Sequence, residues 1–382
     1  MTRSDAVPAR TTAARRPAWP TTLWLALRAA LLTPLLLLAA CQPHAAAGLR
    51  IAGVEAAPPR FTDGVFIAAD GARLPLRRWL PAGAVKAVIL ALHGFNDYSN
   101  SFAAPARLWA ARGIATYAYD QRGFGGAPGR GLWAGSAWLA GDAVTASRIL
   151  RGRYPGRPLY LLGESMGGAV AILAATGAVP GVVAGPGGLP AAEADGVVLS
   201  GPAVWGRSTM DLLPKLTLFA GVRLFPSMVL TGRGLHIVAS DNMPMLHALA
   251  RDPMVIKGAR IDTIYGVVNL MDDALAAAPH LNLPTLMMYG AHDEVVPRRP
   301  IAVFVARLPP DPAHRRTLAY YPKGYHMLLR DLEGPVVAGD VASWVLGRGG
   351  ALPSRADATQ GVKPWPPERL ATAGALLATG RR

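Results

Sequence analysis

Residues 163–168 read GESMGG, with Ser165 at the centre and a glycine two positions to either side. An apolar run at 158–162 (PLYLL) precedes this stretch, and a run of small residues at 169–176 follows it. A strand, a glycine-flanked serine and a helix in this order are typical of a nucleophile elbow, a sharp turn that presents a serine hydroxyl above the sheet. Glycine is required at 163 and 167 because strand and helix backbones meet there. The stretch therefore predicts that Ser165 is a nucleophile.

Outward from this turn, apolar runs alternate with helical patterns. A turn at Asp70-Gly71 predicts a hairpin of residues 65–67 and 74–79. Continuous apolar runs predict strands buried on both faces at 87–92, 114–119, 196–200, 284–289 and 318–321. Apolar residues at three- and four-residue spacing predict helices at 102–112, 138–154, 261–277 and 334–346. The pattern favours an α/β fold with a mostly parallel sheet.

Composition excludes several classes of protein. Half of the 382 residues are hydrophobic, so the chain can bury a sizeable core. This composition is not that of a disordered protein. The formal charge is +15, but the basic residues are mostly arginine and form no run interleaved with aromatics, which argues against nucleic-acid binding. We find neither a dinucleotide fingerprint nor a phosphate-binding loop nor metal-ligand spacing, and we expect no cofactor and no metal.

Three motifs together resemble a known family. HGF at 93–95, DQRGFG at 120–125 and GESMGGA at 163–169 are similar to the monoacylglycerol lipase and lysophospholipase branch of the α/β-hydrolases, also grouped with serine aminopeptidase-like hydrolases. The resemblance covers about residues 60–347 and implies a helical cap at about 203–270, inserted after the strand that follows the nucleophile helix. Glu164 stands where many relatives have histidine and others have glutamate.

The resemblance also implies the remaining site residues. Asp293 in GAHDEVVP (290–297) occupies the acid position, and His326 in KGYH (323–326) occupies the base position. Ser165, Asp293 and His326 then follow in the chain order of α/β-hydrolases. The oxyanion hole would take the backbone amides of Phe95 and Met166. His93 is a second candidate base, but we interpret it as a structural histidine that braces its loop.

Residues 212–230 (LLPKLTLFAGVRLFPSMVL) form the most apolar part of the expected cap. Lys215, Arg223 and two prolines argue against a membrane span. Two interpretations remain open. The stretch is a lid that binds an acyl chain and leans on a bilayer, or a surface that packs the cap onto the core, or both of these on different faces. On the first interpretation, the substrate-binding residues are Leu212, Leu216, Phe219 and Phe225.

The N-terminus has the pattern of an export signal. Positive charge up to Arg28 is followed by an apolar run at 29–40, and residues 38–41 (LAAC) resemble a bacterial lipobox with Cys41 as the lipidated residue. We interpret residues 1–40 as a lipoprotein signal peptide and 41–59 as a tether. An ordinary signal peptide and an uncleaved anchor are the alternatives. Cys41 is the only cysteine, so no disulfide can form within the chain.

These features predict a lipid-anchored serine hydrolase of the bacterial cell envelope that cleaves lipid-like esters such as a monoacylglycerol or lysophospholipid. Gln42 resembles the signal that permits export to an outer membrane in a Gram-negative cell. The alternatives are a peptidase, amidase or acyltransferase of the same fold, or an inactive lipid-binding lipoprotein. The sequence indicates no oligomeric state. Residues 348–382 are predicted to be a poorly ordered tail, with room for a short helix at 368–378.

Overall fold

The computed structural model describes residues 58–178, 191–232, 234, 236–347, 350–359, 361–362 and 365–367. The predicted signal peptide, the lipidation site Cys41 and nearly all of the tether lie outside the described residues, as does the helix predicted at 368–378. Within the described part of the chain, no helix combines the length and the hydropathy needed to cross a bilayer.

A nine-stranded sheet runs through the described domain, in the order β1-β2-β3-β5-β4-β6-β7-β10-β11. Its antiparallel end consists of β1 (Arg60–Thr62), β2 (Val65–Ile67) and β3 (Arg73–Trp79). The remaining strands are mutually parallel: β5 (Ile114–Tyr119), β4 (Ala87–Leu92), β6 (Leu159–Glu164), β7 (Gly196–Ser200), β10 (Thr285–Gly290) and β11 (Arg316–Tyr321). The predicted mostly parallel sheet is confirmed.

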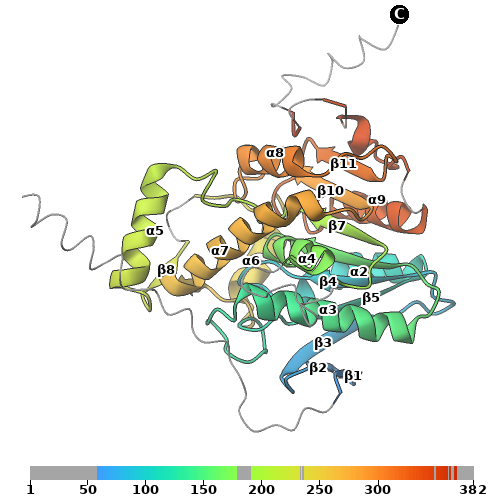
Figure 1. Cartoon of the computed structure of the whole chain (residues 1–382). Helices are drawn as coiled ribbons and strands as arrows, with labels where there is room; N and C mark the ends of the chain where they lie inside the picture. Colours follow the sequence, from blue (N-terminus) through green and yellow to red (C-terminus); the bar gives the residue numbers. More distant parts are fainter. Residues whose placement is uncertain are drawn as a thin grey trace, which may run out of the picture. The chain divides into compact units, whose positions relative to one another are not determined.

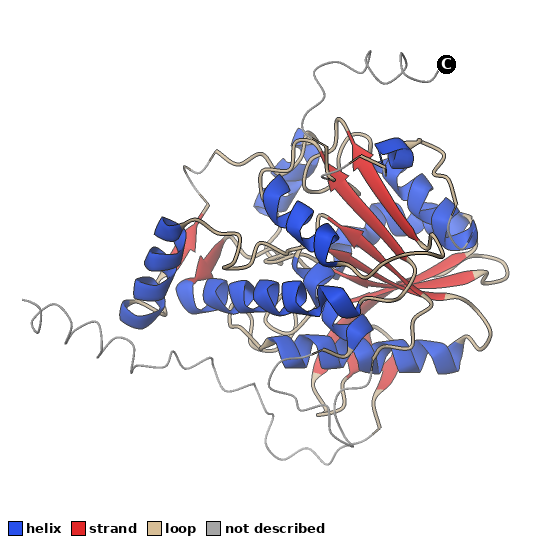
Figure 2. Ribbon diagram, turned by 45° about the horizontal axis from the view of Figure 1, so that its top comes forward, coloured by secondary structure: helices blue, strands red, loops and turns tan. Residues whose placement is uncertain are grey.

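Helices cover both faces of this sheet, as Figure 2 shows. One face packs against α2 (Ala103–Ala111) and α9 (Gly334–Gly347). The other face packs against α3 (Ser136–Arg153), α4 (Met166–Thr176), α7 (Ile261–Ala277) and α8 (Arg298–Arg307). Residues 166–175 of α4 are all buried, which explains why this helix consists of small and apolar residues. The parallel strands β4 to β7 and β10 are buried on both faces, as their continuous apolar runs predicted.

An insertion separates β7 from β10 and occupies the interval in which a cap was expected. It contains α5 (Leu212–Leu224), α6 (Met243–Arg251) and a two-stranded antiparallel sheet of β8 (Val229–Thr231) and β9 (Gly258–Arg260), and it returns through α7. Figures 1 and 2 both show α5 and β8 at the end of α7 that lies away from the central sheet. The short β8–β9 sheet and α6 were not predicted from the sequence.

The C-terminal segment corrects the predicted tail. Leu352, Ala356 and Trp365 are buried, and a 3₁₀ turn forms at Ala356–Thr359. Trp365 packs edge-to-face against Tyr289 of β10, with ring centroids 6.5 Å apart. The prediction of disorder from residue 348 onward is therefore wrong for these residues, because their apolar side chains pack into the hydrophobic core.

Candidate active site

Ser165 lies at the turn between β6 and α4, in a backbone conformation that non-glycine residues rarely adopt. Its φ is 53° and its ψ is −117°. Such a conformation costs roughly 1–3 kcal/mol and persists only where the surrounding structure enforces it. The backbone amide of Ser165 donates to the carbonyl of Ser200 at the end of β7, at 3.0 Å, and its carbonyl accepts from Ala203 at 2.8 Å. These contacts hold the half-buried serine above the carboxyl ends of β6 and β7.

The glycines around Ser165 allow this turn. A Cβ atom on Gly163 would lie 2.3 Å from the carbonyl oxygen of Gly167, and one on Gly167 would lie 2.0 Å from the carbonyl oxygen of Leu92. Both distances are far below a van der Waals contact with rigid backbone. The structure confirms the sequence argument that side chains at these two positions would clash.

Asp293 and His326 form a buried pair. Oδ2 of Asp293 accepts a hydrogen bond from Nδ1 of His326 at 2.8 Å. The other carboxylate oxygen accepts the backbone amides of Val295 and Val296, each at 2.9 Å. Three hydrogen bonds therefore fix the carboxylate, and the carboxylate fixes the imidazole. Because Nδ1 faces Asp293, Nε2 is the ring nitrogen left to accept a proton.

Gly201 lies between this pair and the turn at Ser165. A Cβ atom on Gly201 would lie 3.2 Å from both Oδ2 of Asp293 and Nδ1 of His326. Its neighbour Ser200 is the residue that holds the amide of Ser165. Asp293 follows β10 and His326 follows β11, so three parallel strands bring Ser165, Asp293 and His326 to the same edge of the sheet.

The surroundings of His326 favour its charged form. Burial lowers the pKa of the imidazole, but the charge and hydrogen bond of Asp293 raise it, and the charge of Glu164 raises it further, while Arg330 opposes them. The net effect is a pKa above the ordinary value of 6.5. A histidine of this kind can take a proton and hold it while a negative charge develops nearby.

The two backbone amides predicted to form an oxyanion hole come from two segments, the turn at Ser165 and the loop after β4. Met166 is the first residue of α4, and the first amides of a helix have no acceptor within the helix. Phe95 follows Gly94, where a Cβ atom would lie 3.4 Å from the Cβ of Ser165. The loop after β4 therefore passes close to the serine, as the predicted role of Phe95 requires.

His93 is held as a brace, as the sequence interpretation expected. Its Nε2 accepts the backbone amide of Gln121 at 2.9 Å, and its Nδ1 lies 2.9 Å from the carbonyl oxygen of Gly94. The side chain of Gln121 donates back to the carbonyl of His93. Burial lowers the pKa of His93, which keeps the ring neutral and suits one accepting and one donating nitrogen. Both ring nitrogens are engaged, so His93 does not compete with His326 as a base.

A buried ion-pair bridge beside the site was missed by the sequence analysis. The guanidinium of Arg330 donates to Oδ2 of Asp97 at 2.7 Å and to Oε1 of Glu164 at 2.6 Å. All three residues are buried. Glu164 was noted only as a variable position, and Arg330 carries no local signal, because its partners lie 166 and 233 residues away in sequence.

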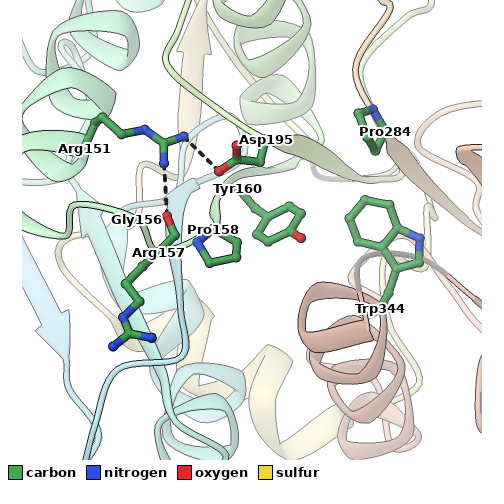
Figure 3. A pocket seen from close by; sticks show the side chains of 8 residues that line it. All are labelled: Arg151, Gly156, Arg157, Pro158, Tyr160, Asp195, Pro284 and Trp344. Atoms are coloured by element: carbon green, nitrogen blue, oxygen red, sulfur yellow. Dashed lines mark hydrogen bonds and ion pairs between the residues drawn. The ribbon is translucent and has the colours of Figure 1, made fainter.

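The described residues line several hollows whose walls do not include Ser165. One of about 320 Å³ is lined by Pro158, Asp195 and Pro284, which directly precede β6, β7 and β10, together with Tyr160 and Trp344 (Figure 3). It therefore lies at the amino ends of the strands, whereas ligands of open α/β sheets bind at the carboxyl ends. Arg151 at its rim is neutralised by Asp195 at 2.8 Å. We assign it no part in the chemistry of Ser165.

The four apolar cap residues predicted to bind substrate are exposed. Side chains from α5 and the residue after it are 70% exposed at Leu212, 54% at Leu216, 37% at Phe219 and 58% at Phe225. Val222 is the buried residue of α5. These four residues therefore lie on the exposed side of the stretch, whereas Val222 packs against the core. None of the four lines the cavity of Figure 3. Their role in binding substrate stays a prediction.

The fold and this arrangement of serine, aspartate and histidine define an α/β-hydrolase. Residues 83–333 match the family described as serine aminopeptidase, S33, and the chain belongs to that family. The match spans the strand before the HGF motif through the loop after His326, which includes every residue of the site described above.

Among the relatives that the chain resembles are monoacylglycerol lipases. The chain is 27% identical to the monoacylglycerol lipase of Mycolicibacterium smegmatis over 285 residues, which cover 74% of this chain and 95% of that protein. It is 26% identical to human monoglyceride lipase over 270 residues, which cover 70% and 84%. The crystal structure of Paleococcus ferrophilus monoacylglycerol lipase has a TM-score of 0.56 at 20% identity, over 72% of this chain and 99% of that chain. That similarity supports the fold.

Proposed function

We propose that this protein is a serine carboxylester hydrolase that cleaves lipid-like esters, such as a monoacylglycerol or a lysophospholipid, through an acyl-enzyme on Ser165. The observation that carries the proposal is the buried Asp293–His326 pair beside the turn that presents Ser165. Similarity to monoacylglycerol lipases from a bacterium and from humans supports the class of substrate.

In the proposed mechanism, His326 removes the proton of Ser165 as the serine oxygen attacks the ester carbonyl. Asp293 holds the imidazole with Nε2 toward the serine and stabilises the imidazolium that forms, without taking the proton itself. The amides of Phe95 and Met166 receive the oxyanion, and each such donor contributes ~3 kcal/mol to lowering the barrier. The alcohol leaves with the proton from His326. Water then repeats the cycle and releases the acid.

A chain-length series of p-nitrophenyl and glyceryl esters tests this function, with p-nitroanilides of the same acids in parallel. We expect ester hydrolysis by the wild type, a strong dependence on acyl length, and labelling of Ser165 by a fluorophosphonate. Ser165→Ala should abolish both the ester hydrolysis and the labelling. Hydrolysis of the anilides at rates equal to the esters would favour an amidase, and a transfer product in the presence of an alcohol would favour an acyltransferase. An unlabelled wild type would favour an inactive lipid-binding protein.

We also propose that the chain is tethered to a membrane of the bacterial envelope through lipid on Cys41. The support is the tetrapeptide LAAC at 38–41, which follows a charged and then apolar leader. Gln42 supports the outer membrane as the destination in a Gram-negative cell. Cys41→Ser should release the protein from the membrane fraction, measured by fractionation and by incorporation of labelled palmitate. A Cys41→Ser variant that fractionates like the wild type, together with a wild type that incorporates no label, would count against the anchor.

A further inference from the structure

The Asp97–Arg330–Glu164 bridge joins the three chain segments that build the site. Asp97 belongs to the loop after β4 that carries Phe95, and its amide closes a turn on the carbonyl of Gly94. Glu164 ends β6 and immediately precedes Ser165. Arg330 follows His326 by four residues in the loop after β11. One guanidinium therefore contacts the segments of the oxyanion loop and the nucleophile, and it lies itself on the segment of the base.

Further contacts fix the histidine loop around Arg330. The carbonyl of Arg330 accepts from the side chain of Asn242 at 2.9 Å. The carboxylate of the next residue, Asp331, accepts from Ser240 at 2.6 Å and from the backbone amide of Tyr325 at 2.7 Å. His326 thus lies in a loop that is held at Tyr325 on one side and at Arg330 and Asp331 on the other. Its position depends on these polar contacts because the loop has no regular secondary structure of its own.

The bridge leaves one charge incompletely compensated. Oε1 of Glu164 is paired with Arg330, whereas Oε2 of Glu164 is buried and, among the described residues, has no hydrogen-bond partner. Arg330 is shared with Asp97, so two carboxylates face one guanidinium. A buried charge acts over a longer range than an exposed one because little water screens it.

We propose that the Asp97–Arg330–Glu164 bridge is a positioning device that aligns the oxyanion loop and the histidine loop with Ser165, and that Glu164 stabilises the imidazolium of His326 during the reaction. The proposal rests on the proposed function, since it concerns the same site. Asp293, from the loop after β10, contacts His326 directly. The charges of Glu164, at the turn of Ser165, and of Arg330, on the histidine loop itself, also act on the imidazole. Glu164 and Arg330 act on the imidazole in opposite directions.

Three single substitutions separate the two roles. Glu164→Gln removes the uncompensated charge and retains a hydrogen-bonding side chain of the same shape. Arg330→Lys retains the positive charge but loses the planar fork that reaches two carboxylates. Asp97→Asn removes a carboxylate from the opposite end of the bridge. Glu333→Gln, an exposed partner of Lys323 in the same region, is the matched control. Arg330→Met is avoided because it would bury two carboxylates without a counter-charge.

The readout is the pH profile of kcat/KM on a soluble p-nitrophenyl ester, together with kcat, KM and thermal stability. We expect Glu164→Gln to move the acidic limb to lower pH, because it removes a charge that favours protonated His326. Arg330→Lys and Asp97→Asn should shift that limb less than Glu164→Gln does. Both should lower kcat roughly 10- to 100-fold through misalignment, with KM within about threefold of the wild-type value. Glu333→Gln should match the wild type.

The outcomes distinguish this proposal from the proposed function. An inert wild type overturns the proposed function itself. An active wild type with an unmoved acidic limb in Glu164→Gln overturns the electrostatic role of Glu164. Wild-type kcat in folded Arg330→Lys and Asp97→Asn overturns the positioning role. If Glu164→Gln does not fold, the other two variants still decide the positioning role, and Glu164→Ala, which removes the carboxylate and adds no titratable group, replaces it in the pH measurement.

Discussion

The imidazole of His326 and the carboxylate of Asp293 lie 2.8 Å apart in a place that water scarcely reaches, and the rest of the carboxylate is held by two backbone amides. The pair is therefore rigid before any substrate arrives. Since only Nδ1 of His326 meets the carboxylate, the tautomer is set by Asp293, and the chemistry proposed for Ser165 depends on it.

Asp293→Asn tests this dependence. The amide can present its N–H to Nδ1 and thereby place the proton on the wrong ring nitrogen, so we expect kcat to fall by about 10³- to 10⁴-fold with little change in KM. Steady-state kinetics on a short soluble ester measures the effect. Asp63→Asn, at an exposed ion pair with Arg78, is the matched control and should retain wild-type rates. A loss below tenfold in Asp293→Asn would contradict the assignment.

The raised pKa of His326 predicts the pH dependence of activity. The base must be neutral, so kcat/KM should rise with pH through a midpoint above 6.5 and then level off. The contribution of His326 to stability changes with pH in the opposite direction. Protonated His326 stabilises the fold fully below pH 6.5, and this contribution is lost as pH rises through the folded-state pKa. A pH–rate profile compared with urea midpoints across the same range checks both. An activity midpoint below 6.5 would contradict the prediction.

The turn at Ser165 predicts that Gly167 cannot be replaced. Gly167→Ala places a methyl group 2.0 Å from the carbonyl oxygen of Leu92 and should destabilise the domain by ~3 kcal/mol, with loss of hydrolysis. Gly152 in α3 is the matched control, because a Cβ atom there meets nothing within 4 Å. Gly152→Ala should stabilise the domain by ~0.5–1 kcal/mol. Equal unfolding free energies for the two variants would overturn the argument.

The C-terminal segment contributes to stability. Trp365 is only 4% exposed and packs against Tyr289, so Trp365→Ala should lower the free energy of unfolding by ~3 kcal/mol. Val362→Ala, in the same segment but 36% exposed, should change it by less than about 0.5 kcal/mol. Urea denaturation measures both. A Trp365→Ala variant as stable as the wild type would contradict this packing and would support the poorly ordered tail that the sequence predicted.

The exposed face of α5 predicts a difference between soluble and membrane-borne substrate. Leu213 and Leu224 are 71% and 54% exposed, and replacing both with serine should leave kcat/KM on a soluble ester within twofold. Hydrolysis of the same acyl ester presented in phospholipid vesicles should fall several-fold, because buried apolar area drives adsorption to an interface. Leu80→Ser, exposed at the end of β3, is the control. Equal losses on both substrates would indicate damage to the fold.

Much of the fold was predictable because its signals are local. The strand at 196–200 and the helix at 261–277 were predicted with the bounds that the structure has, since each is a single apolar pattern of sufficient length. The strands β8 and β9 have three residues each and depend on pairing with one another. Such short strands carry no periodicity, so their existence follows only from the tertiary structure.

The same distinction applies to the site. Ser165 stands in a motif between a strand and a helix, and the sequence pattern indicated it. Asp293 and His326 were indicated by the resemblance of their motifs to those of the family. Arg330 stands in no motif, and its role appears only when the loops after β4, β6 and β11 are brought together. The burial of Trp365 was likewise unpredictable, because it depends on the shape of the surface left open by the sheet and not on the composition of the segment.

The direct pairing of β7 with β10 has an evolutionary consequence. Thr285 stands opposite Val197, so the insertion leaves and re-enters the sheet at adjacent strands. Between the end of β7 and the start of α7, Ala203 is tied to the serine turn, and Ser240 and Asn242 are tied to the histidine loop. The rest of the insertion can lengthen, shorten or be exchanged without altering the pairing that sets Asp293 beside the serine turn. Sequence drift in the untied part of the insertion can thus proceed while the strand pairing beneath the site is conserved.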